Sequence, residues 1–272
     1  MLLLDIDGVI RDVGGSYRRA LAETVHHYSS WRPDPATIDS LKAEGRWNND
    51  WEASLELLRR CNHTPLPAFE ALVDVFSGFY FGGDPSGDPA QWQGFIGDEP
   101  LLVEPDLFAD LNAAGILWGF VSGAEPPSAR FVLEQRLGLD HPPLIAMGDA
   151  PDKPDPTGLL QLAGRLLEHH GLPNLGVEAP PIAYLGDTVA DVITVQQARR
   201  QLPQQTFLSL AVAPPHLHDP DAAERRRTYE TQLIQAGADA VLPSTAAVLT
   251  ALAEALNSQR PGPLSAPAPP AS

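Results

Sequence analysis

Apolar and polar residues follow two different periods along this chain. A short apolar run at residues 2–6 ends in acids, which predicts a buried strand. Residues 16–28 then repeat apolar side chains at helical spacing. From there to about residue 90 the pattern predicts helices alone, one of them at residues 68–79 and another capped by the side chain of Asn49. The chain is therefore expected to begin with one strand followed by a wholly helical segment.

Strands and helices alternate in the rest of the chain. The pattern predicts strands at residues 116–121, 144–147, 181–185, 206–212 and 240–242. It predicts helices at residues 105–114, 128–137, 156–169, 190–199, 221–236 and 246–256. Because each right-handed crossover returns the chain in the same direction, this alternation predicts a parallel sheet.

The order of these elements predicts an α/β core that is interrupted after its first strand. We expect the core at residues 1–13 and 96–258, with an α-helical cap inserted at residues 14–95. An insert at this place lies over the carboxyl ends of the strands, where open parallel sheets place their ligand sites. Residues 259–272 are mainly Pro, Ala and Ser, which cannot build a core, so we expect a disordered tail there.

The charge of the chain narrows the classes of partner. Its 272 residues carry a formal net charge of −17, which repels nucleic-acid phosphates and anionic membranes. An anionic substrate is still permitted, because a bound metal ion can reverse the charge locally. Cys61 is the only cysteine, which excludes an internal disulfide and a cysteine-rich zinc site. No apolar run reaches membrane-spanning length, and we expect a cytoplasmic protein without nucleic-acid or membrane partners.

Acidic side chains gather where predicted strands end. Asp5 and Asp7 lie two residues apart on an extended segment, so both can face the same side. Asp187 ends another predicted strand, and Asp191 follows one helical turn later. Such a cluster of carboxylates repels itself unless a cation binds. Magnesium fits best, because it is a hard ion that prefers oxygen ligands.

The first two acids also suit chemistry at phosphorus. The Asp5 carboxylate is a competent nucleophile that can form an acyl phosphate. Asp7 can then protonate the leaving oxygen and later deprotonate the attacking water. The pair therefore favours phosphoryl transfer through an aspartyl-phosphate intermediate.

Four segments that follow predicted strands resemble the motifs of a known family. They are residues 5–10 (DIDGVI), 122–123 (SG), 153–156 (KPDP) and 186–191 (GDTVAD). In this order they resemble the four motifs of the haloacid dehalogenase-like hydrolase superfamily, which implies a Rossmannoid three-layer core. The helical insert resembles the cap of the branch that contains phosphoglycolate phosphatases and β-phosphoglucomutases. The resemblance covers the whole chain except the tail.

The resemblance implies how a metal ion is held. Asp5, the backbone carbonyl of Asp7 and the side chain of Asp187 would be direct ligands of Mg²⁺. Asp191 would act on the metal through water or by holding Lys153. These roles make Asp5 both nucleophile and metal ligand.

The resemblance also implies how the phosphoryl group is bound. Ser122 and the Gly123 N–H would hold phosphoryl oxygens, and Lys153 would neutralise the charge that develops on them. Lys153 is one of only two lysines in the chain, the other being Lys42, and it stands at the expected place.

Three residues of the insert and its connection are candidate substrate ligands. Arg11 lies four residues after Asp7 and could meet a second anionic group of the substrate. Trp47 and Asn48 offer a flat apolar face and an amide, which suit a small polar metabolite. The alternative for Trp47 is that its ring packs inside the cap at the start of a helix.

We therefore expect an Mg²⁺-dependent phosphatase that hydrolyses a small phosphorylated metabolite. A phosphomutase or a phosphate-ligand sensor without turnover remains an alternative on the same fold. Dehalogenation is disfavoured because haloacid dehalogenases generally lack an acid at the position of Asp7. Phosphonate cleavage is disfavoured because it needs a cap lysine, and Lys42 has the surroundings of a plain helix face. Neither the substrate nor the oligomeric state can be inferred from the sequence.

Overall fold

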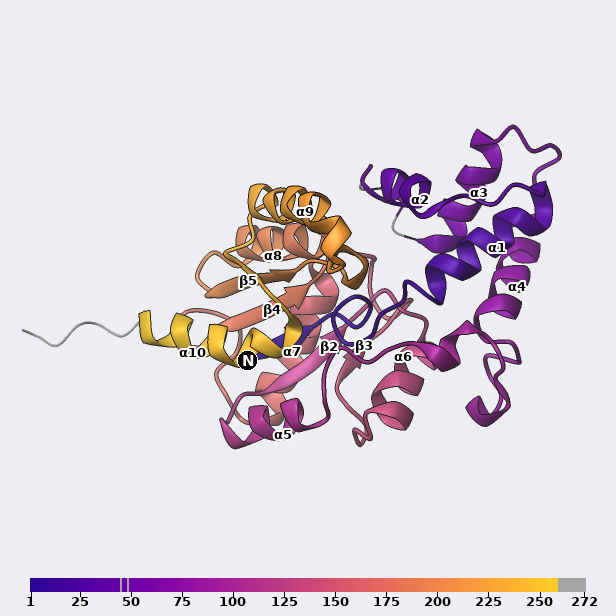
Figure 1. Ribbon diagram of the computed structural model, residues 1–272. Coiled ribbons are helices and arrows are strands. Elements are labelled where there is room, and N and C mark those ends of the chain that lie inside the picture. The colour runs from indigo at the N-terminus through magenta and orange to yellow at the C-terminus, as the bar shows by residue number, and fades with distance from the viewer. Residues whose placement is uncertain (45, 48, 259–272) are drawn as a thin grey trace, which may run out of the picture.

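The computed structural model describes residues 1–44, 46–47 and 49–258. Its two lobes are a core built around a sheet and a lobe of helices inserted near the N-terminus (Figure 1). The tail predicted at residues 259–272 lies outside the described residues, as does Asn48.

Six parallel strands form a single sheet in the core. They are β1 (Leu2–Leu4), β2 (Trp118–Val121), β3 (Leu144–Ile145), β4 (Ile182–Gly186), β5 (Phe207–Val212) and β6 (Ala240–Leu242). The spatial order is β3-β2-β1-β4-β5-β6, and every neighbouring pair is parallel. The predicted parallel α/β core is confirmed, with most strands shorter by a few residues than the apolar runs.

Helices cover both faces of the sheet, because successive side chains of a strand point to opposite faces. Leu2 and Leu4 of β1 belong to one buried cluster, and Leu3 belongs to another. The first cluster contains α5 (Asp106–Ala113), α6 (Pro126–Arg130, continued as a π-helix over Phe131–Arg136) and α10 (Val248–Ser258). The second contains α7 (Thr157–His169) and α8 (Val189–Gln201). Helix α9 (Ala223–Ala236) packs on α8 and β6.

The inserted helices have a hydrophobic core of their own. They are α1 (Tyr17–Ser29), α2 (Pro35–Lys42), α3 (Asp50–Arg60) and α4 (Phe69–Tyr80). Tyr17, Leu21 and Val25 recur on one face of α1 and pack against α3 and α4. The Asn49 side chain accepts hydrogen bonds from the N–H groups of Trp51 and Glu52, at 2.9 and 3.2 Å. These bonds confirm that Asn49 is the N-cap of α3.

We refer to this lobe, from α1 to α4, as the cap. None of the helices in the described part of the chain is both long and apolar enough to cross a membrane.

Candidate active site

The strand order places a crevice between β1 and β4. From β1 the sheet is extended outward in both directions, first through β2 and β3 and then through β4, β5 and β6. Ligands of such sheets bind where the order reverses, at the carboxyl ends of the strands. Asp5 directly follows β1 and Asp187 directly follows β4, so both lie at this point.

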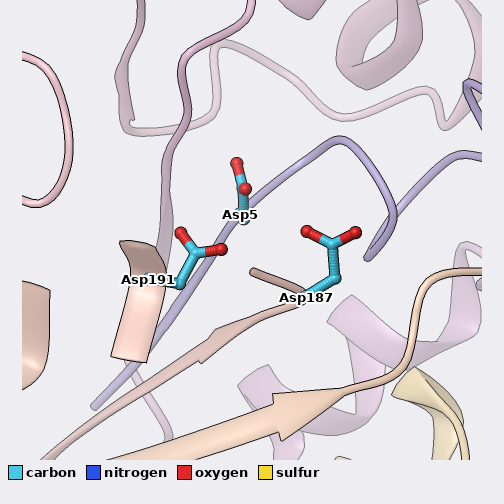
Figure 2. A group of neighbouring side chains, drawn as sticks. All are labelled: Asp5, Asp187 and Asp191. Carbon is cyan, nitrogen blue, oxygen red and sulfur yellow. The ribbon is translucent and has the colours of Figure 1, made fainter. Parts of the chain in front are cut away.

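Three carboxylates converge at this crevice (Figure 2). Asp5, Asp187 and Asp191 are buried, and one carboxylate oxygen from each lies within 4.8 Å of the others. Burial, with Asp191 and Asp7 nearby, raises the pKa of Asp5 to about 6, although Lys153 opposes this rise. Burial and the charges of Asp191 and Asp5 raise the pKa of Asp187 well above its usual value.

Lys153 links two of these carboxylates. Its Nζ donates to Asp5 Oδ2 at 2.7 Å, to Asp191 Oδ1 at 2.5 Å and to the Tyr184 hydroxyl at 3.2 Å. Although burial disfavours a charged amine, Asp191 and Asp5 raise the pKa of Lys153 well above its usual value. The ammonium is therefore fixed beside the carboxylate expected to attack phosphorus. Tyr184, on β4, was not found from the sequence, because an apolar strand gave no sign of a buried hydroxyl.

Asp191 is held on both sides. Its Oδ2 accepts from the backbone N–H of Thr188 at 2.9 Å and from the Thr188 hydroxyl at 2.5 Å, in a capping box at the start of α8. Burial opposes ionisation, but Lys153 and Thr188 hold the pKa of Asp191 below its usual value. The structure thus places Asp191 against Lys153, one of the two positions that the resemblance implied.

Asp7 and Gly8 form the turn after Asp5. The Asp7 side chain is 29% exposed, unlike the buried carboxylates, and its Oδ1 lies 2.7 Å from Arg11 Nε. Gly8 has a φ of +74°, and a Cβ built on it would lie 1.9 Å from Asp187 Oδ2. Only glycine fits at this position, because a side chain would collide with the carboxylate expected to bind metal.

Ser122 and Gly123 follow β2 and line the same cavity as Asp5 and Asp7. Ser122 is buried, and its Oγ accepts from the Ala124 N–H at 3.2 Å, which leaves its own hydroxyl proton available. Gly123 is exposed, so its backbone is accessible to a ligand. That these two residues bind the phosphoryl oxygens, as the resemblance implies, stays a prediction.

Arg11 is a correction, because the structure does not bring it to the cavity. Its side chain is fully buried. The guanidinium lies 2.7 Å from Asp7 Oδ1 and 3.0 Å from Glu99 Oε2, and it donates to the Ser128 hydroxyl at 2.7 Å. With its charge and donors used inside the protein, Arg11 is unsuited to bind a second anionic group of the substrate. Its burial was not foreseen because two of its partners, Glu99 and Ser128, are remote in sequence.

A cavity of about 920 Å³ lies between the cap and the core at the site and is lined by residues of both. Trp47 is not part of its wall: the ring packs against the cap core, and its Nε1 donates to Glu44 at 2.9 Å. The alternative interpretation of Trp47 as a packing residue is therefore favoured. Trp51, four residues later, lines the cavity instead.

Charged side chains of the cap meet the core at the cavity. Asp39 on α2 pairs with Arg18 of α1 and approaches His216 at 3.4 Å and Arg225 at 3.9 Å across the cavity. Lys42 pairs with Asp50 at 2.6 Å. These cavity residues were not assigned a role from the sequence, since only the fold brings the cap helices over the loop before α9.

Glu125 is a further cavity residue that the sequence did not single out. It lies three residues after Ser122, and its Oε2 is buried without a hydrogen-bond partner among the described residues. Burial raises the pKa of Glu125 to about 7, although the nearby Arg11 opposes this rise. An acid directly after the second motif was the only signal available in the sequence.

The acidic residues suit a magnesium ion. Two of the three clustered carboxylates have raised pKa values because of burial and mutual repulsion, and a dication would relieve both effects. All the donors are oxygens, which is the ligand type that Mg²⁺ prefers. The residues that would hold it are Asp5, Asp187 and the backbone carbonyl of Asp7.

Comparison with known sequences gives a partial match. No family model matches the chain. A protein of Phytophthora nicotianae named imidazoleglycerol-phosphate dehydratase is 31% identical over 203 residues, which cover 72% of this chain. The matched part is 41% of that relative, so the chain spans about two fifths of its length.

Solved structures match almost the whole chain. A phosphonoacetaldehyde hydrolase-like protein from Oleispira antarctica is 16% identical, with a TM-score of 0.64, covering 95% of this chain and 94% of that one. A phosphatase from Thermococcus thioreducens is 19% identical, with a TM-score of 0.58 and coverages of 86% and 98%. A β-phosphoglucomutase from Clostridium difficile is 14% identical, with a TM-score of 0.58 and coverages of 94% and 96%. The chain therefore has the haloacid dehalogenase-like fold with a helical cap, as its four motifs indicated.

Proposed function

We propose that the protein is an Mg²⁺-dependent phosphatase that hydrolyses a small phosphomonoester through an aspartyl-phosphate intermediate. The observation that carries this proposal is the pair of contacts from Lys153 to Asp5 and Asp191, inside a buried carboxylate cluster at the carboxyl ends of parallel strands. A buried ammonium beside a carboxylate nucleophile is the arrangement that phosphoryl transfer needs to offset charge on the transferred group.

The reaction would proceed in two steps. An Asp5 carboxylate oxygen attacks phosphorus, the bond from phosphorus to the ester oxygen breaks, and Asp7 gives its proton to the departing alkoxide. Water then attacks phosphorus, Asp7 takes a proton from that water, and the bond between phosphorus and the Asp5 oxygen breaks to release inorganic phosphate. Asp7 is the carboxylate open enough to do this, being 29% exposed on the cavity wall.

The other residues would hold and balance charge. Lys153 would neutralise charge on the phosphoryl oxygens, and the Ser122 hydroxyl and Gly123 N–H would donate hydrogen bonds to them. A bound magnesium ion would supply further electrostatic stabilisation of these oxygens. The cap would exclude water while the first step occurs.

Other chemistries on this fold fit the residues less well. Asp7 argues against dehalogenation, as the sequence already indicated. Phosphonate cleavage uses a cap lysine that forms a Schiff base, and Lys42 is instead paired with Asp50 at 2.6 Å. A phosphomutase differs only in whether water or a second substrate molecule attacks the aspartyl phosphate, so product analysis must accompany the assay.

The assay that tests the proposal measures phosphate release from p-nitrophenyl phosphate, with Mg²⁺ and with EDTA. We expect activity only with Mg²⁺, and a loss of about a thousandfold or more in Asp5→Asn, whose amide is a far poorer nucleophile. Asp110→Asn, an exposed acid on α5, is the matched control and should retain activity. Undiminished phosphate release by pure Asp5→Asn, or by metal-free protein in EDTA, would contradict the proposal.

The relative from Phytophthora nicotianae suggests where a substrate screen should begin. By its name that protein acts on imidazoleglycerol phosphate, a phosphate ester that carries an imidazole ring. Phosphomonoesters with an imidazole therefore belong in the screen, together with sugar and polyol phosphates.

A further inference from the structure

The charges on the cavity wall do not balance. The wall contains eleven carboxylic residues against five lysines and arginines. Each of the five cations has a carboxylate partner within the described part of the chain: Arg18 with Asp39, Lys42 with Asp50, Arg46 with Glu44, Lys153 with Asp5 and Asp191, and Arg225 with Asp39. With Asp5, Asp7 and Asp187 set aside for the metal ion and the phosphoryl group, eight carboxylic residues still face five cations on the wall. The part of the wall left for the leaving group therefore has an excess of negative charge.

Glu125 is a half-buried member of this acidic wall, and one of its carboxylate oxygens is buried. Its Oε2 is shielded from solvent and has no hydrogen-bond partner among the described residues. Arg11, the cation whose charge acts on Glu125, already contacts Asp7, Glu99 and Ser128. Glu125 precedes α6 but does not cap it, since its side chain makes no hydrogen bond to that helix. A buried acceptor left without a donor costs free energy, so a ligand that supplies the donor is favoured.

The position of Glu125 identifies which part of the substrate it meets. It lies on the same wall as Asp7 and Ser122, and the charge of Glu125 acts on the Tyr17 hydroxyl of the cap. The phosphoryl group is expected at Asp5, and we expect the leaving group to extend from there toward the cap, where the charge of Glu125 acts on Tyr17. Trp51 and Tyr17 also line this cavity.

We propose that Glu125 is a specificity-determining residue that binds a cationic nitrogen, an ammonium or an imidazolium, on the leaving group of the substrate. This inference rests on the proposed phosphatase function and names the substrate class of that same site. A carboxylate whose pKa burial raises to about 7 regains its charged form when a cation donates a hydrogen bond to it. The unpaired oxygen thus becomes a selective contact.

Matched pairs of esters test the preference. O-phosphoethanolamine is compared with propyl phosphate, which replaces the ammonium by a methyl group, and 2-(imidazol-4-yl)ethyl phosphate is compared with phenethyl phosphate. We expect the wild-type protein with Mg²⁺ to show a kcat/KM about tenfold or more higher for at least one cationic ester than for its neutral partner. Equal or lower values for both cationic esters overturn the inference.

Variants assign the preference to this side chain. Glu125→Gln should lower the cationic-to-neutral ratio of kcat/KM about tenfold, mainly by raising KM for the cationic ester. Glu125→Lys should reverse the preference toward 2-carboxyethyl phosphate. Glu134→Gln, the same charge change in the adjoining π-helix, where Glu134 pairs with Arg130, should leave the ratio unchanged. A ratio that Glu125→Gln does not alter, in protein whose melting temperature is retained, refutes the role of Glu125.

A binding experiment with inactive protein separates this inference from the proposed function. Dissociation constants of the same esters are measured by calorimetry for Asp5→Asn and for Asp5→Asn with Glu125→Gln. Tighter binding of a cationic ester that disappears with Glu125→Gln supports the inference even if no ester is hydrolysed, in which case only the phosphatase proposal fails. Equal binding of cationic and neutral esters overturns the inference, whether or not the protein has phosphatase activity.

Discussion

A single buried arginine determines how the expected acid–base residue is oriented. Arg11 is fully enclosed and contacts Asp7 on one side and Glu99 on the other. Removing one partner of a buried ion pair leaves an uncompensated charge, which makes such a pair costly to break. The Asp7 carboxylate is therefore tied to the connection between core and cap, and its direction depends on Arg11.

Leaving-group dependence tests this positioning role. Arg11→Lys keeps the charge but lacks the planar fork that contacts Asp7, Glu99 and Ser128 together. We expect kcat for an alkyl phosphate to fall about tenfold more than kcat for p-nitrophenyl phosphate, because nitrophenolate leaves without a proton.

Asp7→Asn should show the same signature more strongly. If Arg11→Lys lowers both rates equally, its effect is general destabilisation and the link to Asp7 is wrong.

At the scale of secondary structure, one helix start supports the site. Helix α8 begins with the capping box of Thr188 and Asp191, and the same Asp191 holds Lys153. The first turn of α8 therefore both stabilises the helix and positions Lys153. By contrast, α2 has an ordinary cap, in which the exposed Asp34 accepts from the Thr37 N–H at 2.8 Å.

Substitutions at these two helix N-cap residues separate an effect on stability from an effect on catalysis. Thr188→Val and Asp34→Ala should each lower the free energy of unfolding by about 0.5–2 kcal/mol, as lost caps do. Only Thr188→Val should also lower kcat, by about tenfold, because Asp191 loses the hydroxyl that orients it toward Lys153. Urea unfolding and phosphate release measure the two effects. An equal kcat in both variants would mean that the hydroxyl of Thr188 does not position Asp191.

The helices and strands show how much of the secondary structure the apolar periodicity of the sequence predicts. The helices at residues 68–79 and 156–169 and the strand at residues 240–242 were found nearly to the residue, because apolar spacing records burial directly. The π-helix at Phe131–Arg136 was expected as ordinary helix, since its hydrogen-bond pattern has no distinct apolar period. The alternation of strands with helices predicted that the strands are parallel, while their spatial order came from the structure.

The site was predictable only where chemistry stays close in sequence. Asp5, Ser122 and Asp187 were singled out because each directly follows a strand, and the carboxyl ends of parallel strands meet. Lys153 was singled out in the loop that follows β3. Glu125, by contrast, became visible only through burial without a partner, which depends on the packing of the whole fold.

At the scale of the whole molecule, charged groups join the two lobes. Asp39 of the cap pairs with Arg18 and lies near His216 and Arg225 of the core. The hydrogen bond with His216 and the charge of Arg18 hold the pKa of Asp39 below its usual value despite its burial. These partly exposed contacts are individually weak and are screened by salt.

We expect the cap to open when this link is removed. Asp39→Asn should increase the radius of gyration measured by small-angle scattering at low salt, and high salt should do the same to the wild-type protein. Arg32→Gln removes an ion pair with Glu23 that lies wholly within the cap, and should leave the radius unchanged. A radius that neither Asp39→Asn nor salt alters would show that other contacts hold the cap in place.

The pairing of Arg11 with Glu99 has a consequence for building chimeras of this protein. The two residues lie on the two connections between core and cap, and Ser16 and Tyr80 also contact Glu99. A foreign cap joined only at residues 14–95 would leave Glu99 and Arg11 behind while removing these two hydroxyl partners. Successful grafts should therefore exchange the insert together with both junctions, or keep a hydroxyl at each of the two positions.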